Sequence, residues 1–447
     1  MRKLFLTVAV LLTAATFAVF AGGNKEGAKA AEPVTLNALW YVDATQAGYQ
    51  DDIAIREKFA KDNPDIKMVY EELFNEPYHD KLSAYIAAGT LPDIMFLWPS
   101  MRSSSALVHE RKLAKDLGPL LGKDFLANFV GPAIDPNQQA SKMLSELPQS
   151  FTYTTAIYTN TKLLKDNGLT VPKTYDDMKA MVAKLKAKGI KTLMIANADK
   201  WPAQSCLFST ITGRLLGNDW WDQAITGKAK FTDAGFVGAL NFYATMFKDG
   251  VMDPADMQLA YGDAPGLFAT GKAAFYVDGD WRVSAFVTDK TSGVALIPPA
   301  NQKSDFEIMN FPAIPGEKNP GVVSAIAGTG YAIAGSIPAG SAKEAAAVKF
   351  IKYLYSPEVQ KIRLETGAYI PSRKGVTSDT IDPFTTKQVA YYGTIAKTTY
   401  VIDGVIDPGV NDVLNNGLQA IGLGQATPEQ VAADIQKAMD DFLAKKK

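Results

Sequence analysis

Residues 34–40 of the chain, VTLNALW, form a short apolar run that ends in a tryptophan, and residues 93–98, DIMFLW, repeat the pattern. Each run is too short for a helix and is bounded by polar or turn residues, so each predicts a buried strand. Helical patterns at 51–62 and 78–88 flank a further predicted strand at 66–70. This β-α-β-α-β order predicts a mainly parallel, doubly wound sheet in an α/β fold.

The alternation of strand and helix patterns starts again near Pro148, which predicts a second sheet. Strands are expected at 152–158 and 190–195. The helix between them opens with Thr174 at its N-cap and Asp177 three residues later, the spacing of a capping box. Further predicted elements are the strands at 273–277, 294–297 and 330–334 and the helix at 342–355.

Four of the six tryptophans lie at or just past the C-terminal end of a predicted strand: Trp40, Trp98, Trp201 and Trp281. In open α/β sheets, ligands bind in the crevice beyond the carboxyl ends of the strands. Flat rings in that place suit the apolar face of a sugar ring, and neighbouring polar groups bind its hydroxyls. One such tryptophan alone would be expected in the core. Four of them predict a binding cleft.

The composition narrows the class of protein. The 447 residues are enough for two or three domains with a sizeable core. Charge is nearly balanced, with 46 Lys and Arg against 47 Asp and Glu, and no basic run is interleaved with aromatic residues. Nucleic acid is therefore not an expected partner.

The N-terminus has the pattern of a secretory signal peptide at 1–21, followed by a polar spacer at 22–32. No other apolar run approaches the length of a membrane span, so we expect the mature protein at the periplasmic or extracytoplasmic face. The only cysteine is Cys206, which excludes an internal disulfide. The lack of a cysteine near the cleavage site argues against a lipid anchor.

Patterns of enzymatic chemistry are sparse. His79 and His109 lack metal-ligand spacing, and no phosphate-binding glycine loop or nucleophile elbow is present, so neither a metal nor a cofactor is predicted. The carboxylate pairs Asp278/Asp280 and Glu71/Glu72 leave a secreted glycoside hydrolase open as an alternative. Carboxylates also accept hydrogen bonds from sugar hydroxyls without catalysis, and we expect no enzyme.

Residues 87–94, AAGTLPDI, resemble a signature of the family 1 extracellular solute-binding proteins, the sugar-binding subunits of ABC importers that include relatives of maltose-binding protein. Segments 158–176, 271–281 and 353–373 are similar to further motifs of this family. The chain departs from the family pattern at Tyr158-Thr159-Asn160, where the family has Tyr-Asn, and at Pro172, where it has two prolines.

The resemblance implies a two-lobed periplasmic-binding-protein fold, in which two sheets are joined by a hinge and the ligand lies between the lobes. One lobe would hold residues 33–148 and 306–354, and the other 149–305 and 355–447. A monomer would capture a carbohydrate and deliver it to a membrane permease driven by a cytoplasmic ATPase. The alternative ligand within the family is a glycerol phosphodiester or another anionic metabolite, with Arg102 or Arg373 as a clamp.

The resemblance and the strand-end positions together assign the following ligand-binding residues: Trp40, Asp43, Trp98, Ser100, Arg102, Tyr153, Asp199, Trp201, Asp280, Trp281, Gly328 and Thr329. Gly328 and Thr329 are expected to bring the backbone close to the ligand. Weaker candidates are Tyr49, Glu72, Asn75 and Arg373.

Overall fold

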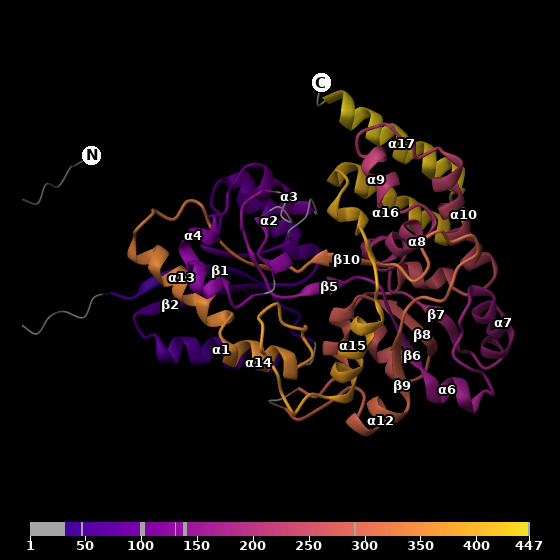
Figure 1. Ribbon diagram of the computed structural model, residues 1–447, viewed down its shortest axis with the longest axis horizontal. Helices are drawn as coiled ribbons and strands as arrows, with labels where there is room; N and C mark the ends of the chain where they lie inside the picture. Colours follow the sequence, from indigo (N-terminus) through magenta and orange to yellow (C-terminus); the bar gives the residue numbers. More distant parts are fainter. Residues whose placement is uncertain are drawn as a thin grey trace, which may run out of the picture.

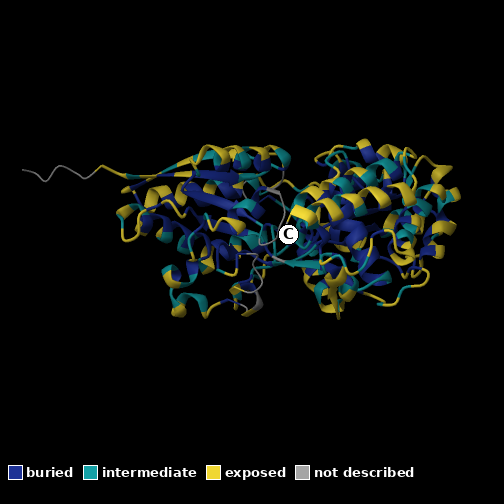
Figure 2. Cartoon of the chain, turned by 90° about the horizontal axis from the view of Figure 1, so that it is seen from above, coloured by how far each residue is buried: buried dark blue, intermediate teal, exposed yellow. Residues whose placement is uncertain are grey.

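Two lobes of α/β structure lie side by side with a narrow connection between them (Figure 1). The computed structural model describes residues 32–45, 48–98, 103–129, 131–136, 141–289 and 292–445. The predicted signal peptide and most of the spacer lie outside these residues. Buried residues fill the interior of each lobe separately, as Figure 2 shows from above. The predicted two-lobed α/β fold is therefore confirmed.

The first lobe is built on a five-stranded sheet with the order β2-β1-β3-β11-β4. Its strands are β1 (Val34–Tyr41), β2 (Ile66–Leu73), β3 (Ile94–Leu97), β4 (Leu147–Pro148) and β11 (Gly330–Ile333). The three strands of the predicted β-α-β-α-β unit, β1 to β3, are parallel. Strand β11, which returns from the second lobe, runs antiparallel to β3.

Helices cover this sheet where the sequence places their start and stop signals. The helices of the first lobe are α1 (Tyr49–Asp62), α2 (Glu76–Ala88), α3 (Ser103–Glu110), α4 (Leu117–Leu121), α5 (Lys123–Leu126), α13 (Ala342–Leu354) and α14 (Pro357–Glu365). Helix α2 ends at Gly89, which adopts the left-handed conformation with φ 66°. Helix α14 begins with Ser356 as N-cap and Pro357 in its first turn. Ile55 and Phe59 of α1 are buried against the sheet.

The second lobe contains a four-stranded sheet with the order β7-β8-β6-β9. Its strands are β6 (Ala156–Asn160), β7 (Lys191–Met194), β8 (Ala273–Asp278) and β9 (Phe306–Met309). Strands β7 and β8 are parallel, so both carboxyl ends lie at the same edge, whereas β6 runs antiparallel to β8 and β9. Its helices are α6 (Thr161–Asp166), α7 (Tyr175–Lys186), α8 (Ser209–Leu215), α9 (Asn218–Ala224), α10 (Ala234–Lys248), α11 (Ala264–Ala269), α12 (Pro299–Ser304), α15 (Pro383–Thr394), α16 (Pro408–Gly422) and α17 (Pro428–Lys445).

A small third sheet connects the lobes, and Figure 1 places its strands β5 and β10 between them. It contains β5 (Phe151–Tyr153), β10 (Val323–Ala327) and β12 (Thr398–Thr399). The segments that cross here touch each other through backbone. A Cβ added at Gly328 would lie 2.0 Å from the carbonyl oxygen of Ser150, and one at Gly330 would lie 2.0 Å from that of Leu147. Only glycine fits at these two crossings.

Two segments lie elsewhere than the sequence predicted. Strand β9, expected in the first lobe, pairs with β6 in the sheet of the second. Helix α14, expected in the second lobe, packs on the core of the first through Val359. A short strand or helix after a crossing carries no sequence signal for the lobe that it joins, because both lobes offer an apolar surface to it.

Two strand predictions also need correction. The run 294–297 forms no strand: Val294 is 66% exposed and Leu296 45% exposed, and only an isolated bridge joins Thr288 to Ala295. The predicted strand at 152–158 is divided into β5 and β6, because its first half belongs to the connecting sheet and its second half to the second lobe.

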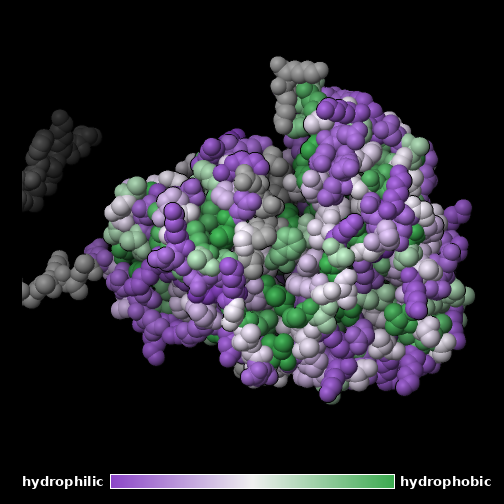
Figure 3. Space-filling view, in the orientation of Figure 1, coloured by the Kyte–Doolittle hydropathy of each residue, from purple (hydrophilic) through white to green (hydrophobic). Residues whose placement is uncertain are grey.

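Hydrophilic residues cover most of the surface of both lobes that Figure 3 presents. None of the helices in the described ranges combines the length and apolarity needed to cross a bilayer.

Candidate ligand-binding site

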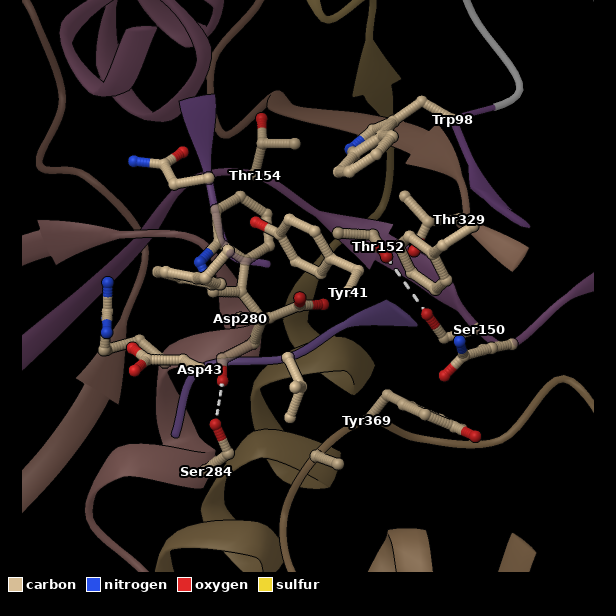
Figure 4. Close-up of a pocket in the computed structure, with 18 of the residues that line it drawn as sticks. Tyr41, Asp43, Trp98, Ser150, Thr152, Thr154, Asp280, Ser284, Thr329 and Tyr369 are labelled. Atoms are coloured by element: carbon tan, nitrogen blue, oxygen red, sulfur yellow. Dashed lines mark hydrogen bonds between the residues drawn. The ribbon is translucent and has the colours of Figure 1, made fainter. Parts of the chain in front are cut away.

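A cavity of about 300 Å³ lies between the lobes, against the connecting sheet. The carboxyl ends of β1 and β3 open into it from the first lobe, and that of β8 opens into it from the second. Figure 4 shows Tyr41, Trp98 and Asp280 around the same space, with Thr154 of the connection beside them. The cavity is therefore where strand ends are expected to place a ligand.

Aromatic rings face this cavity from both lobes. The first lobe contributes Tyr41, Tyr49, Phe74, Phe96, Trp98, Tyr331 and Tyr369. The second contributes Trp201, Tyr261 and Trp281. Hydroxyl, amide and carboxyl groups lie between the rings, among them those of Asp43, Asn75, Ser150, Thr152, Thr154, Asp280 and Thr329. A largely apolar lining with a few polar groups is typical of small-molecule sites.

Trp98 is held in place by contacts with Tyr41 and His109. Its ring lies edge-on to Tyr41, with centroids 5.1 Å apart, and points into the cavity (Figure 4). The Nε2 of His109 lies 2.7 Å from the carbonyl oxygen of Trp98. Because a carbonyl only accepts, Nε2 donates this hydrogen bond. Burial lowers the pKa of His109, so the ring is neutral and serves to fix the backbone beside the site.

The second lobe presents a cluster of three rings. Trp201 lies 4.9 Å from Tyr261 and 6.1 Å from Trp281, measured between centroids. The Nε1 of Trp281 donates to the Tyr261 hydroxyl at 2.6 Å. The ring of Trp281 lies directly over Gly279, where an added Cβ would be only 2.2 Å from it. Glycine at 279 is thus what lets this ring lie flat on the turn.

Asp278 stabilises this cluster through its contacts with Tyr261 and Arg282. It lies in an ion pair with Arg282, in which Nε and Oδ2 are 2.8 Å apart, and it accepts hydrogen bonds from the hydroxyls of Tyr261 and Tyr276. Cys206, fully buried, lies beside it, with Sγ 3.5 Å from Oδ1. Asp278 is not part of the cavity lining and its role is structural.

Asp280 is one of three buried carboxyl groups in the described lining, together with Asp52 and Asp403. It accepts hydrogen bonds from the backbone N–H of Tyr153, at 2.9 Å, and from the hydroxyl of Tyr392. Burial raises the pKa of Asp280 to about 7, because desolvation outweighs these hydrogen bonds. The side chain is an acceptor for a ligand hydroxyl in either protonation state.

The lining brings together six of the predicted site residues: Asp43, Trp98, Trp201, Asp280, Trp281 and Thr329. Of the weaker candidates, Tyr49 and Asn75 also line the cavity. Ser100 and Arg102 lie outside the described residues.

Trp40 does not reach the cavity, which corrects the prediction for this residue. Its side chain is fully buried, stacks on Tyr331 with centroids 4.5 Å apart, and donates from Nε1 to Asp52 at 2.8 Å. Side chains of a strand alternate between its two faces. The next residue, Tyr41, therefore has the position that was predicted for Trp40.

Three other predicted residues act beside the site rather than in it. Tyr153 positions Asp280 through its backbone, as described above. Asp199 accepts a hydrogen bond from Asn75 of the opposite lobe. Gly328 approaches the backbone of Ser150, not the cavity, and donates to its carbonyl at 2.8 Å.

Cationic groups of the cavity are paired. Arg282 is bound to Asp278, and Arg363 is bound to Asp52. Arg373, suggested as an anion clamp, packs on Phe125 and Phe129 outside the lining. In the described ranges, no three His, Cys, Asp or Glu side chains are grouped for a metal ion.

Several functional candidates were missed from the sequence, among them Tyr41, Tyr261, Arg282 and Thr154. Tyr41 could have been found from its place next to Trp40 at the end of a predicted strand. Tyr261 and Arg282 carry no such signal, since they reach the cavity through irregular segments and a 3₁₀ turn.

Comparisons with known proteins agree with this architecture. A family model of bacterial extracellular solute-binding proteins matches residues 42–361. The galactooligosaccharide-binding protein of Bacillus subtilis is 24% identical over 432 residues, 95% of this chain and 94% of that protein. An uncharacterized ABC transporter extracellular-binding protein of Pyrococcus horikoshii is 23% identical over 292 residues, 65% of this chain and 57% of that protein. The structure of a chitin oligosaccharide binding protein, 23% identical, matches with a TM-score of 0.78 over 93% of this chain and 100% of that one.

Proposed function

The chain belongs to the bacterial extracellular solute-binding protein family, and from that premise we propose that it captures a carbohydrate between its lobes for delivery to an ABC importer. One observation carries the proposal: aromatic rings of both lobes, Trp98 on one side and Trp281 on the other, face a single cavity that also holds hydrogen-bonding groups. The C–H faces of a sugar ring would stack on these rings, and its hydroxyls would bind Asp280 and Thr154.

The names of relatives support this class of ligand. One relative is named a galactooligosaccharide-binding protein and another a multiple sugar-binding protein. One structural neighbour is a chitin oligosaccharide binding protein, and another was solved with maltose bound.

The proposal includes no reaction. A glycoside hydrolase needs two available carboxyl groups on either side of the bond that it cleaves. Asp278, the suggested partner of Asp280, is occupied by Arg282 and two tyrosine hydroxyls. A neutral ligand is favoured over an anionic one, because both arginines of the described lining are already paired with carboxylates.

In this proposal the protein is exported, loses residues 1–21 as a signal peptide, and acts as a monomer at the extracytoplasmic face. There it would present the loaded, closed form to a permease whose cytoplasmic ATPase drives uptake. Closure suits this role, because ligand contacts from both lobes are complete only when the lobes meet.

Calorimetric titration against a panel of mono- and oligosaccharides tests the proposal. We expect micromolar or tighter binding of at least one sugar, without release of reducing ends over a long incubation. Absence of binding by every sugar in the panel, together with clear binding of peptides or phosphate esters, would overturn the proposal. Turnover that Asp280→Ala abolishes would overturn the non-enzymatic part.

Two tryptophan variants test whether the sugar binds in this cavity. Trp98→Ala should weaken sugar binding by about 2 kcal/mol, as expected for an aromatic anchor. Trp221→Ala is the control, because Trp221 is fully buried in the core of the second lobe and neither it nor its aromatic neighbours line the cavity. It should lower the free energy of unfolding by about 3–5 kcal/mol, while the folded fraction keeps its affinity.

A further inference from the structure

A second cavity, of about 740 Å³, lies next to the ligand cavity. The side chain of Trp201 lines both cavities. From the first lobe the second cavity is bounded by α2 and α3, and from the second lobe by α16 and the loop 198–201. Figure 1 shows α2 and α3 on one side and α16 on the other side of the seam between the lobes. We call this space the acidic cavity.

Hydrogen bonds between the lobes separate the two cavities. The Nε1 of Trp201 donates to Oδ1 of Asn75 at 3.1 Å, and Nδ2 of Asn75 donates to Asp199. Asn75 lines the ligand cavity, whereas Asp199 lines the acidic cavity. The two cavities therefore adjoin on either side of Trp201 and this bridge, and a ligand that occupies both must replace the hydrogen bond between Asn75 and Asp199.

The acidic cavity is rich in hydrogen-bond acceptors and negative charge. Its lining includes five carboxyl groups and one ammonium group: Glu76, Glu110, Asp199, Asp407, Asp412 and Lys200. The Nζ of Lys200 is bound to Asn416 at 2.7 Å and is not paired with any of these carboxylates in the described ion pairs. Burial and the neighbouring Asp407 raise the pKa of Asp412, and the ammonium group of Lys200 opposes this shift only in part.

Two amide side chains give an independent indication of a ligand. Asn411 and Asn415, one turn apart on α16, line the cavity and are each only 9% exposed. Their Oδ1 atoms have no hydrogen-bond partner among the described residues. A buried amide without partners costs free energy that a bound donor would restore.

We propose that the acidic cavity binds a protonated amino group of the ligand, so that the ligand is an amino-sugar oligosaccharide whose neutral face stacks in the first cavity. A protonated amine offers three donors and a positive charge, which match the acceptors and the charge of this lining. The described side chains form no metal-binding group, so an organic cation fits better than a metal ion. This inference rests on the proposed carbohydrate function.

The test compares glucosamine oligomers of two to four units with their N-acetylated, neutral counterparts of the same length, by calorimetry below the pKa of the amine. At low ionic strength the amino oligomers should bind roughly three- to tenfold more tightly, which is the range of a partly exposed charge pair. Added salt should reduce this difference, because ions screen exposed charges.

Asp412→Asn is the informative variant. Asp412 lies on the surface of α16, whereas Asp407 caps that helix by accepting from the N–H of Gly409. The variant should remove about half of the preference for the amino oligomer on a logarithmic scale and leave binding of the neutral oligomer unchanged. Asp434→Asn, the same charge change on α17, is the control.

The outcomes separate the two proposals. Equal binding of amino and neutral oligomers, or equal effects of Asp412→Asn and Asp434→Asn, overturns the amine site and leaves the carbohydrate function standing. Binding of another neutral sugar without any binding of amino oligomers also overturns it. Absence of binding by every saccharide refutes the carbohydrate function itself.

Discussion

At the scale of single residues, the absence of a side chain at Gly279 lets the ring of Trp281 take its position in the site. A methyl group at this position would lie 2.2 Å from the ring of Trp281, so Gly279→Ala should displace that ring. The backbone of Gly279, with φ −75°, accepts alanine without strain. We expect sugar affinity to fall about tenfold, or roughly 1.4 kcal/mol, with little change in melting temperature.

The control for this substitution is Gly262→Ala, because an added Cβ at Gly262 has open space around it. Equal affinities of the two variants would show that Trp281 does not contact the ligand. A large loss of stability in Gly279→Ala alone would show that the ring belongs to the core.

Asp280 predicts a pH dependence of stability. The ordinary pKa of an aspartate is 3.8, and burial raises that of Asp280 to about 7 in the folded protein. Between these values the folded state binds one proton more than the unfolded state, so this group's contribution to the free energy of unfolding falls as pH rises from about 4 to 7. The slope is at most about 1.4 kcal/mol per pH unit.

Urea unfolding of the protein and of Asp280→Asn across this pH window measures the effect. Because asparagine does not titrate, the difference in unfolding free energy between the two proteins should change steadily from pH 4.5 to 7. Parallel curves would mean that Asp280 has an ordinary pKa in the folded state.

Some residues of the site could be predicted from the sequence, and others could not. The strand ends near Trp40 and Trp98 were found from their apolar runs, and Trp98 does face the cavity. Trp40 faces the core because alternation along β1 exposes Tyr41 instead, and a shift of one residue cannot be recognised without the partner strand. Tyr261 was missed because it arrives from a segment without a periodic pattern.

At the scale of secondary structure, the start of α7 offers a direct test. The predicted capping box is confirmed: Thr174 accepts from the N–H of Asp177 at 3.1 Å, and Asp177 accepts from the N–H of Thr174 at 2.9 Å. Thr174→Ala should therefore lower the free energy of unfolding by about 1 kcal/mol, measured by urea denaturation. Thr174→Ser should retain most of the stability, since serine caps helices equally well.

Elements with strong local signals were predictable, and those defined by distant partners were not. Strands β1, β2, β3 and β8 were expected close to their observed bounds, because each has an apolar run between turn residues. Strand β10, with the sequence VSAIA, was not expected, because small residues give it little apolar character and its partner β5 lies far away in the chain.

At the scale of the whole molecule, the lobes are in direct contact through hydrogen bonds that cross the seam. Besides the Asn75 bridge, the N–H of Gly48 donates to Asp289 of the second lobe at 2.8 Å. Asp199→Ala removes one of these bonds without changing the lining of the ligand cavity. It should destabilise the closed state by about 1 kcal/mol and so weaken binding of a neutral sugar about fivefold.

Small-angle scattering measures the closure itself. The radius of gyration should decrease on saturation with sugar in the unmodified protein, and Asp199→Ala should need more sugar for the same decrease. Asp434→Ala on α17 is the control, because Asp434 lines neither cavity. A radius of gyration that does not change with sugar would rule out closure as the response to ligand.

The complete burial of Cys206 has a practical consequence for spectroscopy. Since the chain has no other cysteine, and this one is inaccessible in the folded protein, a thiol introduced at the surface would be the one that a maleimide dye modifies. Exposed lysines such as Lys67 on the first lobe and Lys188 on the second are suitable positions for a donor and an acceptor dye. Energy transfer between them would convert each capture of a ligand into an optical signal, and the protein would become a sensor for its own cargo.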